Sequence, residues 1–344
     1  MIEKYGKSVA DIKNSKQSFF DDNDKLVQAQ NICAELYKKQ PIRHKCKNCD
    51  ASLKDGIHYV SHNVTYIICG NCGHVNGNHI ETEEYSEYLY SDSKYGTYMY
   101  GGNAEKAKYD SRIEKIYFPK VEFLLDVLER EEQIRRMEID LLDIGAGSGY
   151  FVSACDDAGI KAKGIELSRQ QVEYGNIFLH NTLGGTLEQI RGEELEERIL
   201  TSDANVISAI GVLEHLIDYH SVLKAMKENS HIRYLYMMVP MFGLSNILET
   251  LTPDVYNRHL GGPHTHVFSS KSIDFLCKTY GMEIIGKWQF GTDIMDLYRM
   301  CITKNNEELG AIIHKMFYKC IDEMQEVLDR NDFCSEIHVV LKFV

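Results

Sequence analysis

An apolar strand that ends in an acid and runs directly into alternating glycines constrains this chain more than any other feature. The segment reads Leu141-Leu142-Asp143-Ile144-Gly145-Ala146-Gly147-Ser148-Gly149. Gly145 and Gly147 allow a tight turn and let the backbone approach a ligand at a point where a Cβ would collide. In open α/β sheets, ligands bind outside the carboxyl ends of the strands. The sequence therefore predicts a nucleotide-type ligand at the end of this strand.

The spacing of the glycines separates two classes of nucleotide. A dinucleotide fingerprint needs glycine at the sixth place of its pattern, and that place, counted from Gly145, is Tyr150. Gly149 instead completes a GxGxG spacing, which resembles the S-adenosylmethionine (SAM) loop of class I methyltransferases. Glu166 ends a second short strand. It lies roughly twenty residues after the glycine turn, which is where a carboxylate commonly accepts hydrogen bonds from the ribose hydroxyls of a bound nucleotide. A tight turn without a ligand is the alternative. The resemblance implies a SAM site formed by Asp143, Gly145, Ala146, Gly147, Gly149, Glu166, Leu167 and Gly211.

Length, composition and charge limit the classes of function. A chain of 344 residues is long enough for two domains or for one large domain with extensions, and 44% hydrophobic with 26% charged residues is an ordinary globular balance. A formal charge of −13 argues against a general nucleic-acid binder, because phosphate contacts need a basic surface. We find neither an apolar run long enough to span a membrane nor the apolar core of a signal peptide. We therefore expect a cytoplasmic protein with no membrane partner and with reduced cysteines.

Two CxxC pairs, Cys46 with Cys49 and Cys69 with Cys72, have the spacing of a zinc site. Residues 57–60 and 64–68 read as two short strands between the pairs, as in a zinc ribbon. Four thiolates fill a tetrahedral site and leave no position for water, so the zinc ion is expected to be structural. A redox role for the CxxC pairs is the alternative.

The ribbon is also locally basic, so a nucleic-acid partner is retained as an alternative hypothesis. Its basic residues are Lys38, Lys39, Arg43, Lys45, Lys47 and Lys54. Zinc ribbons often bind nucleic acid. A module of this size, however, is too small to bury a sufficient hydrophobic core and needs a metal ion or disulfides for stability. A structural zinc ion therefore explains the cysteines equally well.

Strands and helices alternate through the rest of the chain, which predicts a Rossmann-like α/β domain with a mostly parallel seven-stranded sheet and helices on both faces. Strands are expected at 141–144, 205–210 and 234–239, and near 282–290 and 297–303. The predicted organisation is an N-terminal helical segment (1–45), a zinc ribbon (46–80), a tyrosine-rich connector (81–108), a methyltransferase domain (109–303) and a C-terminal helical extension (304–344). The extension is a candidate contact for a homo-oligomer.

Glu214 and His215 follow the strand at 205–210, so their side chains are expected to face the ligands. Methyl transfer is an in-line displacement at a sulfonium carbon, and the protein mainly aligns the nucleophile and removes its proton. Histidine titrates near neutrality and suits that task, with Glu214 orienting or polarising it. A purely structural histidine is the alternative.

A long connection between Pro240 and Phe268 is typical of a functional lid. Candidate contacts for an anionic or polyhydroxylated substrate are Arg258, His264 and His266 of this lid, with Tyr88 and Tyr90 of the connector. The lid histidines could instead form a catalytic metal site with Glu214 and His215, as in small-RNA methyltransferases, although the paired glutamates of such a site are absent.

The order of ribbon, tyrosine connector, GxGxG domain and Glu-His strand end resembles the SAM-dependent sugar methyltransferases, especially the deoxysugar C-methyltransferases. In that family a four-cysteine zinc module precedes the methyltransferase domain, and the Glu-His pair supplies the proposed base. The resemblance implies these roles for the four ribbon cysteines and for His215 with Glu214, and it implies a nucleotide-activated sugar or surface-glycan precursor as acceptor.

The family also carries a substantial C-terminal domain that residues 304–344 are too few to hold, so methylation at carbon, oxygen or nitrogen stays open. Two alternatives to a small-molecule enzyme are an RNA-modifying methyltransferase that uses the ribbon for binding and a non-catalytic scaffold with a methyltransferase fold.

Overall fold

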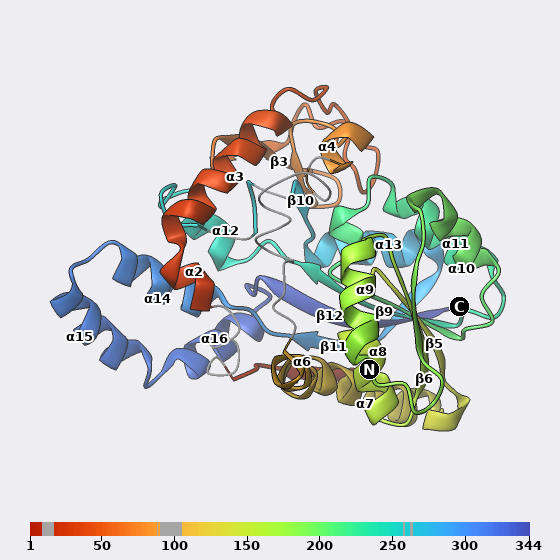
Figure 1. The fold of residues 1–344 in the computed structure, drawn as a ribbon. Helices are drawn as coiled ribbons and strands as arrows, with labels where there is room; N and C mark the ends of the chain where they lie inside the picture. The colour runs from red at the N-terminus through yellow and green to blue at the C-terminus, as the bar shows by residue number, and fades with distance from the viewer. Residues whose placement is uncertain (9–16, 88, 90–104, 257–258, 262–263) are drawn as a thin grey trace.

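The computed structural model describes residues 1–8, 17–87, 89, 105–256, 259–261 and 264–344 (Figure 1). Its centre is an eight-stranded sheet with the strand order β1-β11-β12-β9-β8-β5-β6-β7. The strands are β1 (Ile2–Tyr5), β5 (Asp140–Ile144), β6 (Lys161–Glu166), β7 (Thr186–Gln189), β8 (Val206–Ile210), β9 (Tyr234–Pro240), β11 (Met282–Gln289) and β12 (Glu336–Phe343). Only β12 runs antiparallel to its neighbours. The other seven strands end at one side of the sheet, the carboxyl edge.

Helices cover both faces of this sheet, as the alternating pattern predicts. One face carries α6 (Lys106–Arg112), a π-helical turn (Ile113–Tyr117), α7 (Phe118–Glu132), α8 (Tyr150–Asp157) and α9 (Arg169–Phe178). The other carries α10 (Leu195–Leu200), α11 (Tyr219–Glu228) and α13 (Ser270–Tyr280). Short 3-10 turns lie at Arg136–Glu138, Gly192–Glu194 and Leu213–His215. Within the part of the chain that the structure describes, every helix is too short or too polar to cross a membrane.

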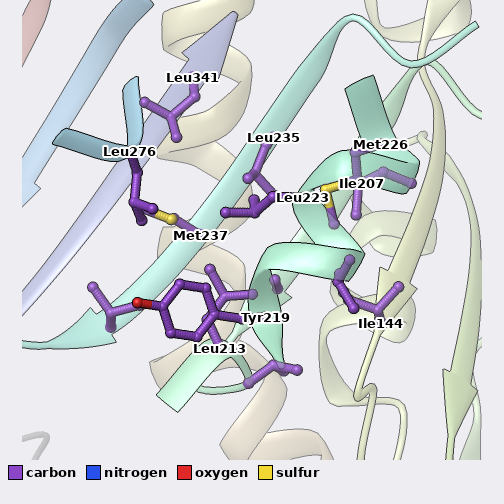
Figure 2. Packing of buried hydrophobic residues seen from close by; sticks show 14 of the residues in the cluster. Ile144, Ile207, Leu213, Tyr219, Leu223, Met226, Leu235, Met237, Leu276 and Leu341 are labelled. Carbon is purple, nitrogen blue, oxygen red and sulfur yellow. The ribbon is translucent and has the colours of Figure 1, made fainter. Parts of the chain in front are cut away.

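The core beneath α11 and α13 fixes the loops at the carboxyl edge. Leu223 and Met226 of α11 and Leu276 of α13 lie in one buried cluster with the apolar side chains of β8 and β9 (Figure 2). Leu213, which directly precedes Glu214, is fully buried in the same cluster. Burying a side chain of this size contributes roughly 1.5–3 kcal/mol of transfer free energy. The Glu-His turn is therefore anchored in the core by its own neighbour.

The cysteine-rich segment forms a second, smaller sheet with the order β10-β4-β3-β2. Its strands are β2 (Ile57–Ser61), β3 (Val64–Ile68), β4 (Val75–Gly77) and β10 (His266–Val267). The first two are the strands predicted from the sequence. Other helices of the N-terminal part are α2 (Gln17–Asp21), α3 (Asn23–Tyr37) and α4 (Glu83–Glu87), and α3 packs on this sheet through Cys33, Ala34 and Tyr37.

The connection at 240–268, which the sequence predicts as a lid, contains regular secondary structure. It contains α12 (Leu244–Glu249), and its end forms β10, which pairs antiparallel with β4 of the cysteine module. The module and α3 consequently lie over the same side of the large sheet as the ends of β8 and β9 (Figure 1). The lid and the module share one sheet.

Three other predicted segments have a different structure. Residues 297–303, expected to be a strand, lie in α14 (Asp293–Thr303), because a short buried apolar run does not distinguish a helix from a strand. The extension at 304–344 contains α15 (Glu307–Phe317) and α16 (Ile321–Asp329) but ends in β12, which lies inside the large sheet. The N-terminal segment, expected to be helical, begins with β1, which pairs with β11 and gives the sheet its eighth strand.

Candidate functional site

The glycine turn at the end of β5 has a shape that only glycine tolerates well. Gly145, Gly147 and Gly149 have positive φ angles of 64°, 55° and 73°. A Cβ on Gly145 would lie 2.6 Å from Cγ2 of Val212. The Ala146 N–H donates to the Ile165 carbonyl at 3.0 Å, which fixes the turn against the end of β6. A tightly curved backbone is therefore held at the carboxyl edge, as the sequence predicts.

Two acids lie beside this turn. Asp143 is 3% exposed and accepts a hydrogen bond of 2.6 Å from the Ser208 hydroxyl, and burial raises the pKa of its carboxyl to about 7. The Glu166 carboxylate accepts one hydrogen bond from the Gly147 N–H and two from the N–H groups of Leu167 and Ser168, each at 2.8 Å. A carboxylate has about four lone-pair positions, so Glu166 retains capacity for a ribose hydroxyl.

These residues fit SAM. The turn offers a cradle that a Cβ would fill, Glu166 is a preoriented acceptor, and the half-exposed Leu167 presents apolar surface next to it. When SAM is bound there, it supplies an electrophilic methyl group on a positively charged sulfur. The protein's own contribution is to orient the donor and the acceptor.

Two supporting residues were not predicted from the sequence. The Tyr109 hydroxyl donates to the Ser148 carbonyl at 2.9 Å and lies 3.1 Å from the Ser153 hydroxyl, which braces the turn from α6. Ser208 lies opposite Asp143 in the pairing of β5 with β8. The signal for Ser208 was a polar residue within an otherwise apolar buried strand. Tyr109 had no comparable signal, since its contact depends on how α6 packs.

Substitution of Gly145 tests the cradle. We expect Gly145→Ala to weaken SAM binding by more than tenfold, because the new methyl group meets Val212 and the backbone φ of 64° is strained for alanine. Gly184→Ala is the matched control: Gly184 has a φ of 78° but no atom within 4 Å of its Cβ position. Isothermal titration with SAM measures both variants. Equal SAM affinity in the two would count against this turn as the cofactor site.

The Glu-His turn, Leu213–His215, lies at the end of β8 on the same edge. Glu214 is 4% exposed, and its Oε1 is 3.9 Å from Nε2 of His215, which is longer than a hydrogen bond. Burial, and secondarily the Lys47 ammonium, lowers the pKa of His215 to about 4. The imidazole is therefore neutral near pH 7 and able to accept a proton, although a pKa this low makes it a weaker base than an ordinary histidine.

Of the predicted lid residues, the structure brings His264 to this turn. The rings of His215 and His264 have centroids 4.9 Å apart, and ligand-type atoms of Glu214, His215 and His264 lie within 4.8 Å of one another. His266, in β10 of the lid, is instead buried, and its Nδ1 lies 3.0 Å from Nε2 of His74, so it is not positioned to contact a substrate. Arg258, Tyr88 and Tyr90, the remaining candidates, lie outside the described residues.

The four ribbon cysteines converge as the spacing predicts. Their sulfurs lie within 4.8 Å of one another, and the Cys46–Cys72 and Cys49–Cys69 sulfur pairs are each 3.6 Å apart. A tetrahedral site with Zn–S bonds of about 2.3 Å separates its sulfurs by roughly 3.8 Å, so the four thiols fit a zinc ion. The side-chain amides of Asn48 and Asn76 lie 3.5 Å from Cys72 and Cys46 and can donate to thiolate sulfur.

Comparison with solved structures gives methyltransferases of low sequence identity. Magnesium protoporphyrin IX methyltransferase from Synechocystis PCC 6803, solved with bound S-adenosylhomocysteine (SAH), is 11% identical and superimposes with a TM-score of 0.46 over 75% of this chain and 98% of that one. For a plantazolicin methyltransferase, also with SAH, the identity is 12%, the TM-score 0.46 and the coverage 75% and 94%. For a SAM-dependent methyltransferase from Archaeoglobus fulgidus, these values are 16%, 0.38, 72% and 97%. No curated protein matches the chain.

Residues 109–287, more than half of the chain, match the model of the family described as "Methyltransferase domain". The match begins at Tyr109, which braces the glycine turn, and continues through the Glu-His turn into β11. The chain therefore belongs to this family and is a SAM-dependent methyltransferase.

Proposed function

We propose that this enzyme methylates a small molecule, a nucleotide-activated sugar or a surface-glycan precursor, and that His215 removes the proton from the acceptor. The position of His215, at the end of β8 on the same edge of the sheet as the glycine turn and with its ring 4.9 Å from that of His264, is the observation that carries this proposal. A base at this position would take the acceptor's proton as the acceptor attacks the methyl carbon. His264 would line the other side of the same space.

The basic residues of the ribbon favour a small-molecule acceptor over RNA. Arg43 and Lys47 are 10% and 7% exposed and both pair with Glu81. Lys45 pairs with Asp50 and Lys38 with Glu35. In RNA binding, Lys and Arg side chains displace the counterions of the phosphates. Arg43 and Lys47 are buried in their pairs with Glu81 and are not available for this task, whereas the Lys45 and Lys38 pairs are exposed and weak. We therefore propose that the cysteine module, with a structural zinc ion, supports the enzyme rather than binding nucleic acid.

We also propose a base rather than a metal ion at Glu214, His215 and His264. These three groups have the spacing of a metal site. The Lys47 ammonium, however, is close enough to lower the pKa of His215 and would repel a divalent cation. Small residual rates without added Mg²⁺ or Mn²⁺, and strong stimulation by either ion, would favour the metal alternative.

A transfer assay tests the acceptor class. The full chain is incubated with methyl-labelled SAM and, in parallel, with a panel of nucleoside diphosphate sugars and with RNA transcripts. We expect label to appear in a sugar nucleotide, with a gain of one methylene in its mass, and not in RNA. Labelled RNA, together with RNA binding that weakens steeply with salt, would contradict the small-molecule proposal.

A further inference from the structure

One residue of the cysteine module reaches the turn that carries Glu214 and His215. Lys47 lies between the metal-site cysteines Cys46 and Cys49. Its side chain is 7% exposed, and its ammonium donates to the carbonyl of Leu216 at 2.8 Å. Leu216 is the residue directly after His215. We call residues 46–49 the zinc knuckle. Through Lys47 it holds the end of the Glu-His turn by a hydrogen bond from a charged donor, which is stronger than a hydrogen bond between neutral groups.

The same ammonium is shared with Glu81, which also contacts the lid. Lys47 Nζ lies 3.3 Å from the Glu81 carboxylate, which pairs with Arg43 as well. The Thr265 hydroxyl donates to the other oxygen of this carboxylate, and Thr265 directly follows His264. Burial alone would raise the pKa of Glu81, but the Lys47 and Arg43 cations lower it below its ordinary value. Glu81 is therefore an ionised link between the module, the Glu-His turn and the lid.

The backbone of the knuckle is fixed where Lys47 begins. The Lys47 N–H donates to the Asn76 side chain at 2.8 Å, and the Lys47 carbonyl lies 3.1 Å from Nε2 of His220 on α11. The next residue, Asn48, accepts from the Tyr219 hydroxyl at 2.9 Å and donates to the Ser272 carbonyl at 3.2 Å. These contacts dock the knuckle on α11 and α13 and leave the Lys47 side chain little freedom.

We propose that Lys47 is a positioning residue, through which the zinc knuckle fixes the Glu-His turn and the lid histidine His264 in one arrangement. The inference rests on the proposed role of His215. It gives the cysteine module a second task besides folding: the ion that orders Cys46 and Cys49 also sets the position of the lysine between them. Loss of the ion would then disturb the catalytic turn from outside the methyltransferase sheet.

Lys45 provides a matched control, because it flanks Cys46 on the other side. Its side chain is 66% exposed and pairs only with the exposed Asp50 among the described contacts. Lys47→Met, Lys47→Arg and Lys45→Met are compared in the full chain, each after confirmation that zinc content and SAM affinity equal those of the unaltered protein. If Lys47→Met loses zinc, Lys47→Gln takes its place, because it also removes the ammonium but keeps a polar side chain that can donate a hydrogen bond.

The first measurement is the protonation of His215, followed by NMR of the full chain labelled at histidine, with His215→Asn used to assign the signal. Groups facing His215 are Glu214 on its own turn, His264 from the lid and Lys47 from the module. Removing a cation favours the protonated imidazole, so we expect the pKa of His215 to rise by about one unit in Lys47→Met and to be unchanged in Lys47→Arg and Lys45→Met. An unchanged His215 signal and pKa in Lys47→Met would overturn the proposal.

The second measurement is turnover on the sugar nucleotide identified in the transfer assay. We expect Lys47→Met to lower kcat at least tenfold with little change in KM for SAM, Lys47→Arg to restore most of it, and Lys45→Met to leave it unchanged. His215→Asn could retain full turnover while the His215 pKa still rises in Lys47→Met. In that case His215 is not the base, but the contact of Lys47 with the Glu-His turn is supported. If Lys47→Met retains full kcat and an unchanged His215 signal, the positioning role is wrong.

Discussion

Replacing His215 with asparagine is expected to lower turnover by about 10²–10⁴, the usual contribution of a general base, while SAM affinity stays unchanged. Asparagine keeps much of the size and polarity of the ring but does not accept a proton near neutral pH. Initial rates with labelled SAM measure the first effect, and isothermal titration measures the second. His231→Asn is the control, because His231 is exposed and precedes β9 at the opposite edge of the sheet.

The pH dependence of turnover gives an independent check on His215. Its pKa of about 4 means that protonation removes the base only as the pH falls toward that value. Turnover limited by His215 is therefore expected to be flat between about pH 6 and 8, whereas an ordinary histidine would produce a loss of rate below about pH 6.5. Full turnover in His215→Asn, or an acidic limb near pH 6.5 that this variant retains, would exclude His215 as the base.

Substitution of a ribbon cysteine is expected to have the largest effect on stability. Cys69→Ser removes one of four converging thiols from a buried position. Structural zinc sites contribute on the order of 10 kcal/mol to folding in zinc-finger peptides, so we expect loss of bound zinc and a clear fall in the unfolding temperature. Because β4 of the module pairs with β10 of the lid, turnover is expected to fall as well.

Metal analysis and thermal unfolding measure these effects on the purified full chain. Cys320→Ser is the matched control: Cys320 lies just before α16, is partly exposed and is remote in sequence from the ribbon. It is expected to retain zinc and stability. Zinc content and unfolding temperature that are unchanged in Cys69→Ser would contradict the structural zinc site, and a mass loss of about two hydrogens on oxidation would favour the redox alternative.

The sequence predicts the shape of the glycine turn well because its signals are local. A positive φ favours glycine, and Gly145, Gly147 and Gly149 all have one. The N-cap at Ser168, whose hydroxyl accepts from the Gln171 N–H, and the left-handed C-cap at Gly281 are local signals of the same kind. Each depends on residues a few positions apart, so each is readable from one chain.

The arrangement of the lid and the Glu-His turn depends on pairings between distant segments. β12 contains mostly buried residues, so no alternation marks it as a strand, and its place between β9 and β11 comes from the whole sheet. The pairing of β10 with β4 buries His266, and Thr265 of the lid bonds Glu81 beside the module. Lys47 belonged to a basic cluster in the sequence, and only the fold shows that its ammonium reaches Leu216.

Calorimetric titration of the full chain with SAM tests the central claim most directly, that the edge formed by the glycine turn and Glu166 binds the methyl donor. One SAM per chain is expected to bind, with affinity weakened more than tenfold in Gly145→Ala and retained in His215→Asn. A folded, zinc-containing chain that shows no binding of SAM would contradict the claim.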